Sequence, residues 1–364
     1  MNSTDVEAAG RHRASVPINE LRLAAAAFAI VALGYFAIHP LRDPNTDFLH
    51  FYAGARLVGP DLYSLEKTRA IQEELSPGVL TLKNPVRAVV RPPFLYLLFQ
   101  PLGSLPYERA VWIWQALNVS ALALFVFLWP ADRLMIAACF GLFVPLWYGL
   151  YQAQDFGLFL LAFAASAWLK RANWQIVAGA ILSLCAGKPN VFLLLPITLL
   201  AARSWRFGIG FIGGGLFLYG LSAMILGGDF GWPASYLAHL ASVYSIFTGN
   251  RSGIVLAVVL GAILGVLLAR RRAAFPAAIA VLLAGSLIAA QRPSFYDAAA
   301  LVPLTLVLMQ ARRVVIPVAA ICLLTVAWHL FGWVVARPVA VAFLAYAVWV
   351  DHSSAEVFGG WASE

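Results

Sequence analysis

Apolar runs of about 20 residues follow one another along nearly the whole chain, and no other feature restricts the possible folds as strongly. A helix of about 20 apolar residues crosses a bilayer core of roughly 30 Å, and its internal hydrogen bonds satisfy its own backbone polar groups. The chain is 62% hydrophobic and 12% charged, a composition that excludes an ordinary soluble domain. We therefore predict an all-α polytopic membrane protein.

The apolar runs and the polar breaks between them predict about twelve crossings. They are expected near 21–38, 107–129, 133–150, 152–169, 174–187, 189–202, 207–226, 252–270, 274–290, 295–310, 314–331 and 338–350. Segment 39–106 is expected to form an outer loop of short helices. Its apolar stretch 94–105 is about half the length needed to cross, which favours a re-entrant or interfacial helix. The expected organisation is a cytoplasmic tail at 1–20, one transmembrane domain at 21–350 and a second cytoplasmic tail at 351–364.

The basic residues of the short loops set the orientation, because an excess of Lys and Arg marks the cytoplasmic side. The groups that fall on one side are Arg133, Lys170 with Arg171, Arg203 with Arg206, Arg270 to Arg272, and Arg312 with Arg313. Both termini then lie in the cytoplasm, and the loop at 39–106 lies outside. These residues flank apolar segments and form no single basic face, so the net charge of +8 does not indicate nucleic acid as a partner.

Motifs for metals and cofactors are absent from the sequence. The three cysteines all lie inside apolar segments and are odd in number, which predicts neither a disulfide framework nor a zinc site. The histidines lack metal-ligand spacing, and no Walker motif or GxGxxG unit occurs. We therefore expect no metal and no cofactor.

Under this topology, the polar residues that interrupt apolar segments all emerge on the outer side, although only the basic loops were used to derive it. They are Asp47, Arg91, Gln152, Gln154, Asp155, Lys188, Asn190, Asn250, Arg251, Gln291, Arg292 and Asp297. Ionisable residues at membrane depth are unfavourable and usually mark a cavity or a pathway. The pattern predicts a functional site at the outer face.

Three cations of this set suit an anion such as phosphate. Lys188 precedes Pro189, which breaks the helix and frees backbone groups that need a polar cavity. Arg91 and Arg292 each precede a proline, so each stands at a helix start with a guanidinium that can bind phosphate bidentately. The alternatives are a loop lysine whose charge reaches the interface and two arginines that anchor to lipid headgroups.

Asp47 stands at the membrane surface before an aromatic belt, and two explanations of it stay open. It either caps a short interfacial helix or serves as a general base at the lipid–water boundary. Asp155 and Asp297 are interpreted first as helix caps, and the turn at 151–155 as an ordinary polar turn or as part of the site. His50 is expected to be an exposed interfacial histidine, although it is close enough along a helix to contact Asp47.

Several short motifs occur in a distinctive order along the chain. They are Asp47-Phe48 with Phe51-Tyr52-Ala53-Gly54-Ala55, Gly59-Pro60-Asp61-Leu62-Tyr63, Pro92-Pro93-Phe94 with Leu98-Phe99-Gln100-Pro101-Leu102 and Leu105-Pro106, Trp114 with Leu117-Asn118, Gln154 with the apolar run after it, and Ala178-Gly179 through Lys188-Pro189. Their order resembles glycosyltransferase family 87, polytopic enzymes of the C-type fold related to polyprenyl-phosphate-mannose-dependent mannosyltransferases. The resemblance covers about 47–196, with weaker similarity at Asn250 and at 292–303. The chain departs from the family pattern at Arg91, Ala153, Phe156 and 294–297, positions expected to shape the sugar and acceptor pockets.

The resemblance implies an inverting glycosyltransferase of the C-type fold. It implies transfer of a hexose, with mannose as the first candidate, from a polyprenyl-phosphate sugar to a glycolipid or glycan acceptor at the outer face of a bacterial plasma (inner) membrane. Asp47 matches the family acid and is expected to be the catalytic base, with Lys188, Arg91 and Arg292 binding the donor phosphate and Tyr52, Tyr63, Gln154 and Asp297 binding substrate. The expected partners are the donor, the acceptor and membrane lipids.

A multi-pass transporter or lipid flippase is the competing interpretation, because polar residues among many helices also line substrate pathways. Two features count against it. The polar set gathers at one face instead of the midplane, and the sequence contains no internal repeat with paired broken helices.

Overall fold

The structure is a computed structural model that describes residues 18–39, 46–75, 77, 86–189, 193–244, 251–271, 274–290, 293–310 and 315–353. All regular structure in these residues is helical. The α-helices are α1 (Ile18–Ile38), α2 (Phe48–Arg56), α3 (Leu65–Leu75), α4 (Pro93–Gly103), α5 (Tyr107–Leu128), α6 (Arg133–Leu142), α7 (Val144–Tyr151), α8 (Phe156–Arg171), α9 (Gln175–Ser183), α11 (Thr198–Ala202), α12 (Trp205–Ile225), α13 (Trp232–Tyr244), α14 (Arg251–Arg271), α15 (Phe275–Ala289), α16 (Val302–Gln310), α17 (Val315–Phe331) and α18 (Trp333–Ser353). Three 3-10 helices join them, η2 (Leu184–Gly187), η3 (Leu195–Ile197) and η4 (Phe295–Leu301).

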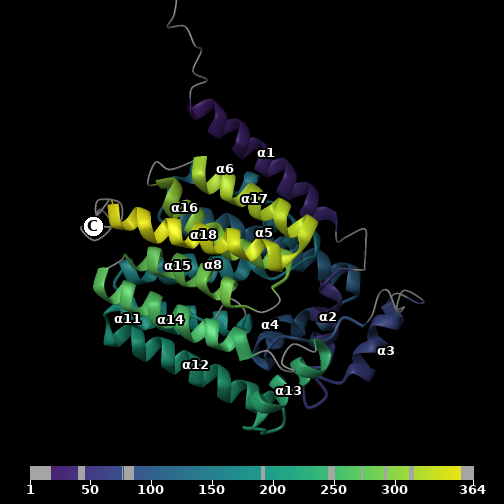
Figure 1. Cartoon of the computed structure of the whole chain (residues 1–364). Helices are drawn as coiled ribbons and strands as arrows, with labels where there is room; N and C mark the ends of the chain where they lie inside the picture. The colour runs from purple at the N-terminus through teal and green to yellow at the C-terminus, as the bar shows by residue number, and fades with distance from the viewer. Residues whose placement is uncertain are drawn as a thin grey trace, which may run out of the picture.

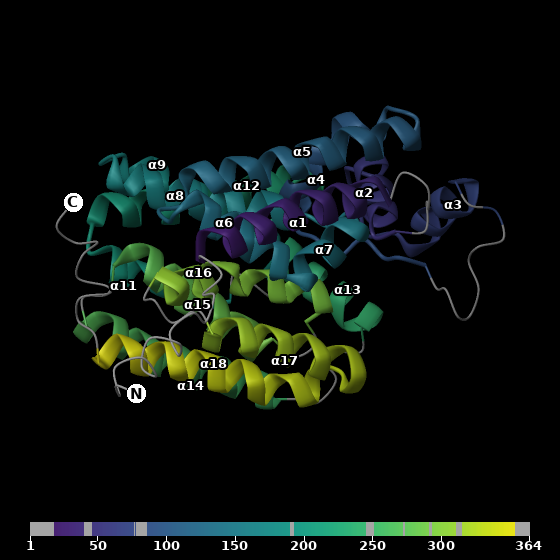
Figure 2. The same ribbon diagram turned by 90° about the horizontal axis from the view of Figure 1, so that it is seen from above.

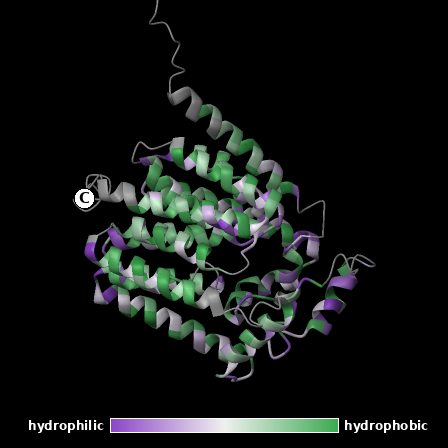
Figure 3. Cartoon of the chain, in the orientation of Figure 1, coloured by the Kyte–Doolittle hydropathy of each residue, from purple (hydrophilic) through white to green (hydrophobic). Residues whose placement is uncertain are grey.

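The longer helices lie alongside one another in a bundle with two distinct ends (Figures 1 and 2). Helices α2, α3 and α13 gather at one end, and α9 and α11 lie at the other. Hydrophobic residues cover the lengths of the helices, and many of the hydrophilic residues gather near the ends (Figure 3). This is the distribution expected of helices that cross an apolar layer.

Among the residues that the structure describes, two helices, α5 and α12, are long and apolar enough to cross a membrane. The pair α6 and α7 counts as a third span if its bend of 72° lies within one span. The shorter apolar helices are Ala26–Ile38, Gln175–Gly187, Val255–Arg270, Phe275–Ala289, Phe295–Gln310, Ile316–Phe331 and Trp333–Val348. The all-α prediction is confirmed, and these candidate spans indicate an integral membrane protein. The count of twelve crossings exceeds what this criterion supports and stays a prediction.

Several expected crossings are interrupted. The run at 133–150 breaks at Phe143 between α6 and α7, because Pro145 in the first turn of α7 has no N–H with which to continue α6. The run at 174–187 ends in η2, and the run at 295–310 begins in η4. Both irregular segments carry functional candidates, since Lys188 follows η2 and Asp297 lies in η4. Helix α13 was not expected from the sequence.

The described part of segment 39–106 forms the short helices expected of it. Helices α2 and α3 occupy its first part, and α4 forms where the interfacial or re-entrant helix was expected. Close contact between α2 and α4 needs a glycine, because a Cβ on Gly54 would lie 2.2 Å from the Tyr96 ring. Phe51 of α2, Phe99 of α4 and Trp114 of α5 pack together in one aromatic cluster. This packing fixes the start of α2 relative to α5.

Helix α15 is the centre of the main core, because every residue that it contains except Pro276 is buried. A helix that is apolar on all sides is surrounded by other helices. Near it, α9 and α12 approach closely at Gly210, where a Cβ would lie 1.9 Å from the carbonyl oxygen of Ile176. Such contact between small residues is a common way to pack membrane helices. It anchors α9, whose continuation η2 leads to Lys188.

Candidate active site

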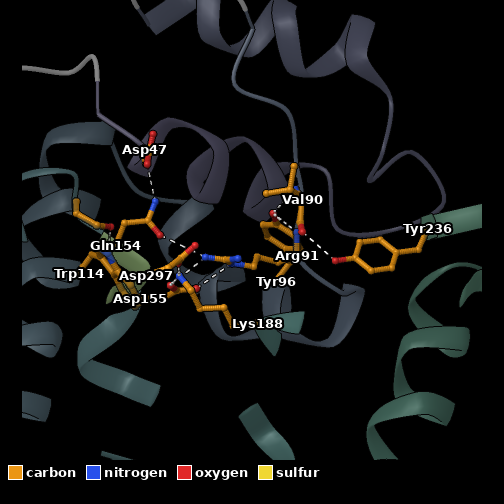
Figure 4. Close-up of polar contacts among 11 residues, drawn as sticks. Asp47, Val90, Arg91, Tyr96, Trp114, Gln154, Asp155, Lys188, Tyr236 and Asp297 are labelled. Carbon is orange, nitrogen blue, oxygen red and sulfur yellow. Dashed lines mark hydrogen bonds and ion pairs between the residues drawn. The ribbon is translucent and has the colours of Figure 1, made fainter. Parts of the chain in front are cut away.

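Asp47 lies at the start of α2, where its carboxylate binds two side chains from distant parts of the chain. Its Oδ1 accepts from Nη1 of Arg87. Its Oδ2 accepts from Nε2 of Gln154 at 2.6 Å (Figure 4). Asp47 occupies the N-cap position of α2, but its side chain accepts no hydrogen bond from the helix backbone. The capping explanation therefore does not account for this carboxylate.

Gln154 links Asp47 to a buried ion pair. Its Oε1 accepts from Nη2 of Arg91 at 3.3 Å. The Arg91 guanidinium also binds Asp155 through two parallel contacts, Nε to Oδ2 at 2.9 Å and Nη2 to Oδ1 at 3.0 Å. Bidentate pairing of this kind fixes both distance and orientation. Asp155 also stands at a helix N-cap without capping it, so the expectation that it acts as a cap is wrong.

Lys188 joins two carboxylates at the inner end of this series. Its Nζ lies 3.2 Å from Oδ1 of Asp155 and 3.1 Å from Oδ1 of Asp297. The ammonium also lies 3.9 Å from the centroid of the Phe156 ring, close enough for a cation–π contact. Asp297 accepts from the backbone N–H of Ser294 at 2.7 Å within a capping box. It therefore takes part in capping η4, but from the N3 position, and Ser294 is the N-cap residue.

We call the six charged residues and Gln154 the charge network. Its members come from five segments, and cations alternate with carboxylates along it. In order they are Arg87, Asp47, Gln154, Arg91, Asp155, Lys188 and Asp297. Their formal charges sum to zero, which a buried cluster needs because an unpaired charge in an apolar interior is strongly unfavourable.

Exposure divides the charge network into two parts. The side chains of Asp47 and Arg87 are 18% and 25% exposed. By contrast, Lys188 is 1% exposed and Asp155 is fully buried. We call Asp47 and Arg87 the rim pair, and Arg91, Asp155, Lys188 and Asp297 the inner cluster. A molecule from outside can reach the rim pair first.

The extended segment at 87–91 carries both arginines and is fixed by side chains from other helices. Gln72 of α3 donates to the carbonyl of Arg87 at 2.7 Å and accepts from its N–H at 3.0 Å. Tyr63 and Tyr236 donate to the carbonyls of Arg91 and Val90, each at 2.9 Å. These bonds satisfy backbone groups that no helix or sheet would satisfy. The backbone positions of both arginines are therefore fixed from several sides.

His50 is buried beside the charge network, so the expectation of an exposed interfacial histidine is wrong. Its Nε2 has no hydrogen-bond partner among the described residues. Burial lowers the pKa of His50 from 6.5 to about 4, Asp47 and Asp155 oppose this shift, and Arg91 and Arg87 add to it. His50 is therefore a neutral imidazole near neutral pH.

The structure brings together most of the residues predicted for the site. Asp47, Gln154, Arg91, Lys188 and Asp297 all belong to the charge network, and Tyr63 adjoins it through the Arg91 carbonyl. The hydroxyl of Tyr52 donates elsewhere, to the carbonyl of Leu105 at 2.7 Å. Arg292 lies outside the described residues.

Sequence reasoning missed one member of the charge network and misread another. Arg87 is one of several cations in a long polar loop, and nothing local distinguishes it from the others. Asp155 was included among the polar residues that indicate a site at one face, but its side chain was interpreted first as a helix cap. Its position next to Gln154, at the edge of an apolar run, was the signal that it is buried.

The arrangement offers a partly exposed carboxylate and a guanidinium at the rim of a rigid, neutral cluster. In a comparison with protein families, residues 90–310 match the model described as "Glycosyltransferase family 87". The matched residues include Arg91, Gln154, Asp155, Lys188 and Asp297, while the rim pair lies before them. Comparisons with curated proteins and with solved structures gave no match.

Proposed function

The chain belongs to glycosyltransferase family 87, and from this premise we propose that it is an inverting hexosyltransferase that uses a polyprenyl-phosphate sugar. Family membership implies transfer of a sugar from a donor to an acceptor. The finer proposal is a hexose, with mannose as the first candidate, moved to a glycolipid or glycan acceptor. No member of the charge network is needed to bind a nucleotide in this scheme.

Asp47 is proposed as the general base. The observation that carries this assignment is the exposed edge of its carboxylate, which Gln154 holds in place from the family-matched part of the chain. In an inverting displacement, the acceptor hydroxyl attacks the anomeric carbon while a base takes its proton. The C1–O bond to phosphate breaks in the same step, and its electron pair stays on the phosphate oxygen.

Cations are proposed to stabilise the lipid phosphate that leaves. Lys188, Arg91 and Arg292 are the candidates from the sequence, and the first two lie in the charge network. Because Arg91 and Lys188 are already paired with carboxylates, their proposed contribution is to the fixed field of the site. Tyr63, Gln154 and Asp297 are proposed to line the substrate side, together with Tyr52.

The proposed site opens to the outer side of the membrane. Helix α8 begins beside Asp155 and carries Lys170 and Arg171 in its last turn. Its basic end therefore lies away from the acids of the site, which supports an outward-facing site under the positive-inside rule. The proposal retains the C-type fold, twelve crossings and cytoplasmic termini.

The test is transfer by the purified protein in lipid nanodiscs. Radiolabelled undecaprenyl-phosphate sugars would be supplied with a membrane lipid extract, and matching nucleotide sugars would serve as comparison donors. We expect product only from a polyprenyl-phosphate sugar, with the anomeric configuration of the new bond opposite to that of the donor by NMR. Product from the nucleotide sugar, or retention of configuration, would contradict the proposal. Movement of lipid across the bilayer without any transfer would favour the transporter interpretation.

A further inference from the structure

We propose that Arg87 is the residue that binds the donor phosphate directly, and that it releases Asp47 to act as a base when it does so. In the structure, Arg87 engages Asp47 at the rim of the site. This inference rests on the proposed function, because it takes the ligand to be a lipid-linked phosphate. It adds a residue that lies before the family-matched part of the chain.

The other described cations of the charge network are poorly placed for direct contact. Arg91 is locked to Asp155 by two hydrogen bonds and also donates to Gln154. Lys188 is enclosed between Asp155 and Asp297, with 1% of its side chain exposed. A phosphate that took either cation would leave a carboxylate buried without its partner, which is strongly unfavourable.

Arg87 is more accessible than Arg91 or Lys188. Its side chain is 25% exposed and that of its carboxylate partner is 18% exposed, against 9% for Arg91 and 1% for Lys188. An ion pair that keeps contact with water is weaker than a fully buried one, so an incoming phosphate can compete for the guanidinium. Guanidinium groups also bind phosphate bidentately.

The backbone of Arg87 is fixed although its side chain reaches the surface. Gln72 is 1% exposed and makes both of its amide bonds to the backbone N–H and carbonyl of this one residue. Few other side chains of α3 are buried, namely Thr68 and Ile71. We assign Gln72 as a positioning residue that holds the guanidinium within reach of both Asp47 and the phosphate.

Exchange of partners explains how one carboxylate can serve as a base in this setting. In the structure, Oδ1 of Asp47 accepts from Arg87 and Oδ2 accepts from Gln154. When Arg87 turns to the phosphate, Oδ1 becomes available to the acceptor hydroxyl. The acceptor oxygen bonds to C1, its proton passes to Oδ1, and the C1–O electron pair stays on the phosphate beside Arg87.

The test measures binding of farnesyl phosphate, with farnesol as the uncharged comparison, to the protein in nanodiscs. We expect the wild type to prefer farnesyl phosphate and Arg87→Ala to lose at least about tenfold of that affinity, since a charge-assisted phosphate contact is removed. Asp47→Asn should bind farnesyl phosphate several-fold more tightly than wild type, because the competing carboxylate is gone. If the Asp47–Arg87 pair were only structural, the affinity of Asp47→Asn for farnesyl phosphate would not increase. Arg56→Ala, which removes the exposed Arg56–Glu74 pair of the same loop, is the matched control and should bind as wild type does.

A second readout tests Gln72 and Arg87 in turnover. We expect Gln72→Ala to raise the KM for the donor more than it lowers kcat, and Arg87→Lys to restore part of the affinity lost in Arg87→Ala. Wild-type affinity for farnesyl phosphate in Arg87→Ala, or unchanged affinity in Asp47→Asn, would overturn the assignment of Arg87 while leaving the proposed transferase intact. A wild type that does not distinguish farnesyl phosphate from farnesol would overturn both.

Discussion

The rim pair and the inner cluster contain the same kinds of residue, yet their surroundings differ. In the inner cluster, Asp155 is fully buried and receives Arg91 and Lys188 together. At the rim, the side chains of Asp47 and Arg87 remain partly exposed. This difference in burial supports our proposal that the inner cluster holds the structure while the rim pair takes part in the chemistry.

The largest effect on stability is expected from Asp155→Asn. This change removes the carboxylate that neutralises two buried cations, and breaking a buried pair typically destabilises by about 3 to 5 kcal/mol. The melting temperature in nanodiscs, followed by tryptophan fluorescence, should fall by many degrees. Asp61→Asn is the matched control, because Asp61 forms an exposed pair with Lys67. Equal melting temperatures for both variants would show that burial does not determine how much an ion pair stabilises this protein.

A somewhat smaller loss of stability is expected at low pH, through His50 in helix α2. Burial lowers the pKa of this imidazole from 6.5 to about 4. Arg91 and Arg87 add to this shift, and Asp47 and Asp155 oppose it. Below pH 6.5 the unfolded chain takes up the proton and the folded chain does not, so stability falls as the pH drops toward 4. The loss is about 3 kcal/mol over this window.

Melting curves between pH 7 and pH 4 check this expectation by comparison of the wild type with His50→Gln. This variant should flatten the dependence of melting temperature on pH. Identical slopes for wild type and His50→Gln would show that His50 does not carry the effect.

A third effect, on the connection between the two regions, is expected from Gln154→Ala. Gln154 binds both Asp47 and Arg91, so its loss leaves the rim carboxylate less well oriented. We expect turnover to fall about 10- to 100-fold and stability to fall by about 1 to 2 kcal/mol. Gln152→Ala is the control, since its amide donates to the Tyr148 hydroxyl instead. Normal turnover in Gln154→Ala would show that the rim pair does not depend on its connection to the inner cluster.

The smallest effect is expected from Arg56→Ala. Its partner Glu74 is 62% exposed, and such surface pairs contribute about 0 to 1 kcal/mol. The melting temperature should change by no more than a degree or two. A loss close to that of Asp155→Asn would mean that exposure does not set the strength of ion pairs in this protein.

The helices and several members of the charge network were predictable from the sequence. Runs of apolar residues indicated the helical segments, and the order of motifs singled out Asp47, Gln154 and Lys188 as candidates. The break at Phe143 was missed, although Pro145 is visible in the sequence, because length and hydrophobicity alone suggested one crossing. Helix α13 was missed because its segment follows a polar, glycine-containing stretch and continues no long apolar run.

Arg87 and the burial of His50 depend on tertiary contacts and had no local signal. Arg87 meets Asp47 across 40 residues, through a segment placed by Gln72 and by tyrosines of other elements. His50 has the local sequence of an interfacial helix, and only packing beside the charge network buries it. Pairings of this kind arise from the way the loop folds back over the helix ends.

The most direct test of the account is the turnover and the melting temperature of Asp47→Asn, measured on one preparation with Asp61→Asn beside it. We predict that Asp47→Asn melts within a few degrees of wild type and loses transfer by about a hundredfold to ten-thousandfold, the range expected for removal of a general base. Asp61→Asn should retain both properties. Transfer by Asp47→Asn at a rate close to wild type would contradict the claim that the rim carboxylate carries the chemistry.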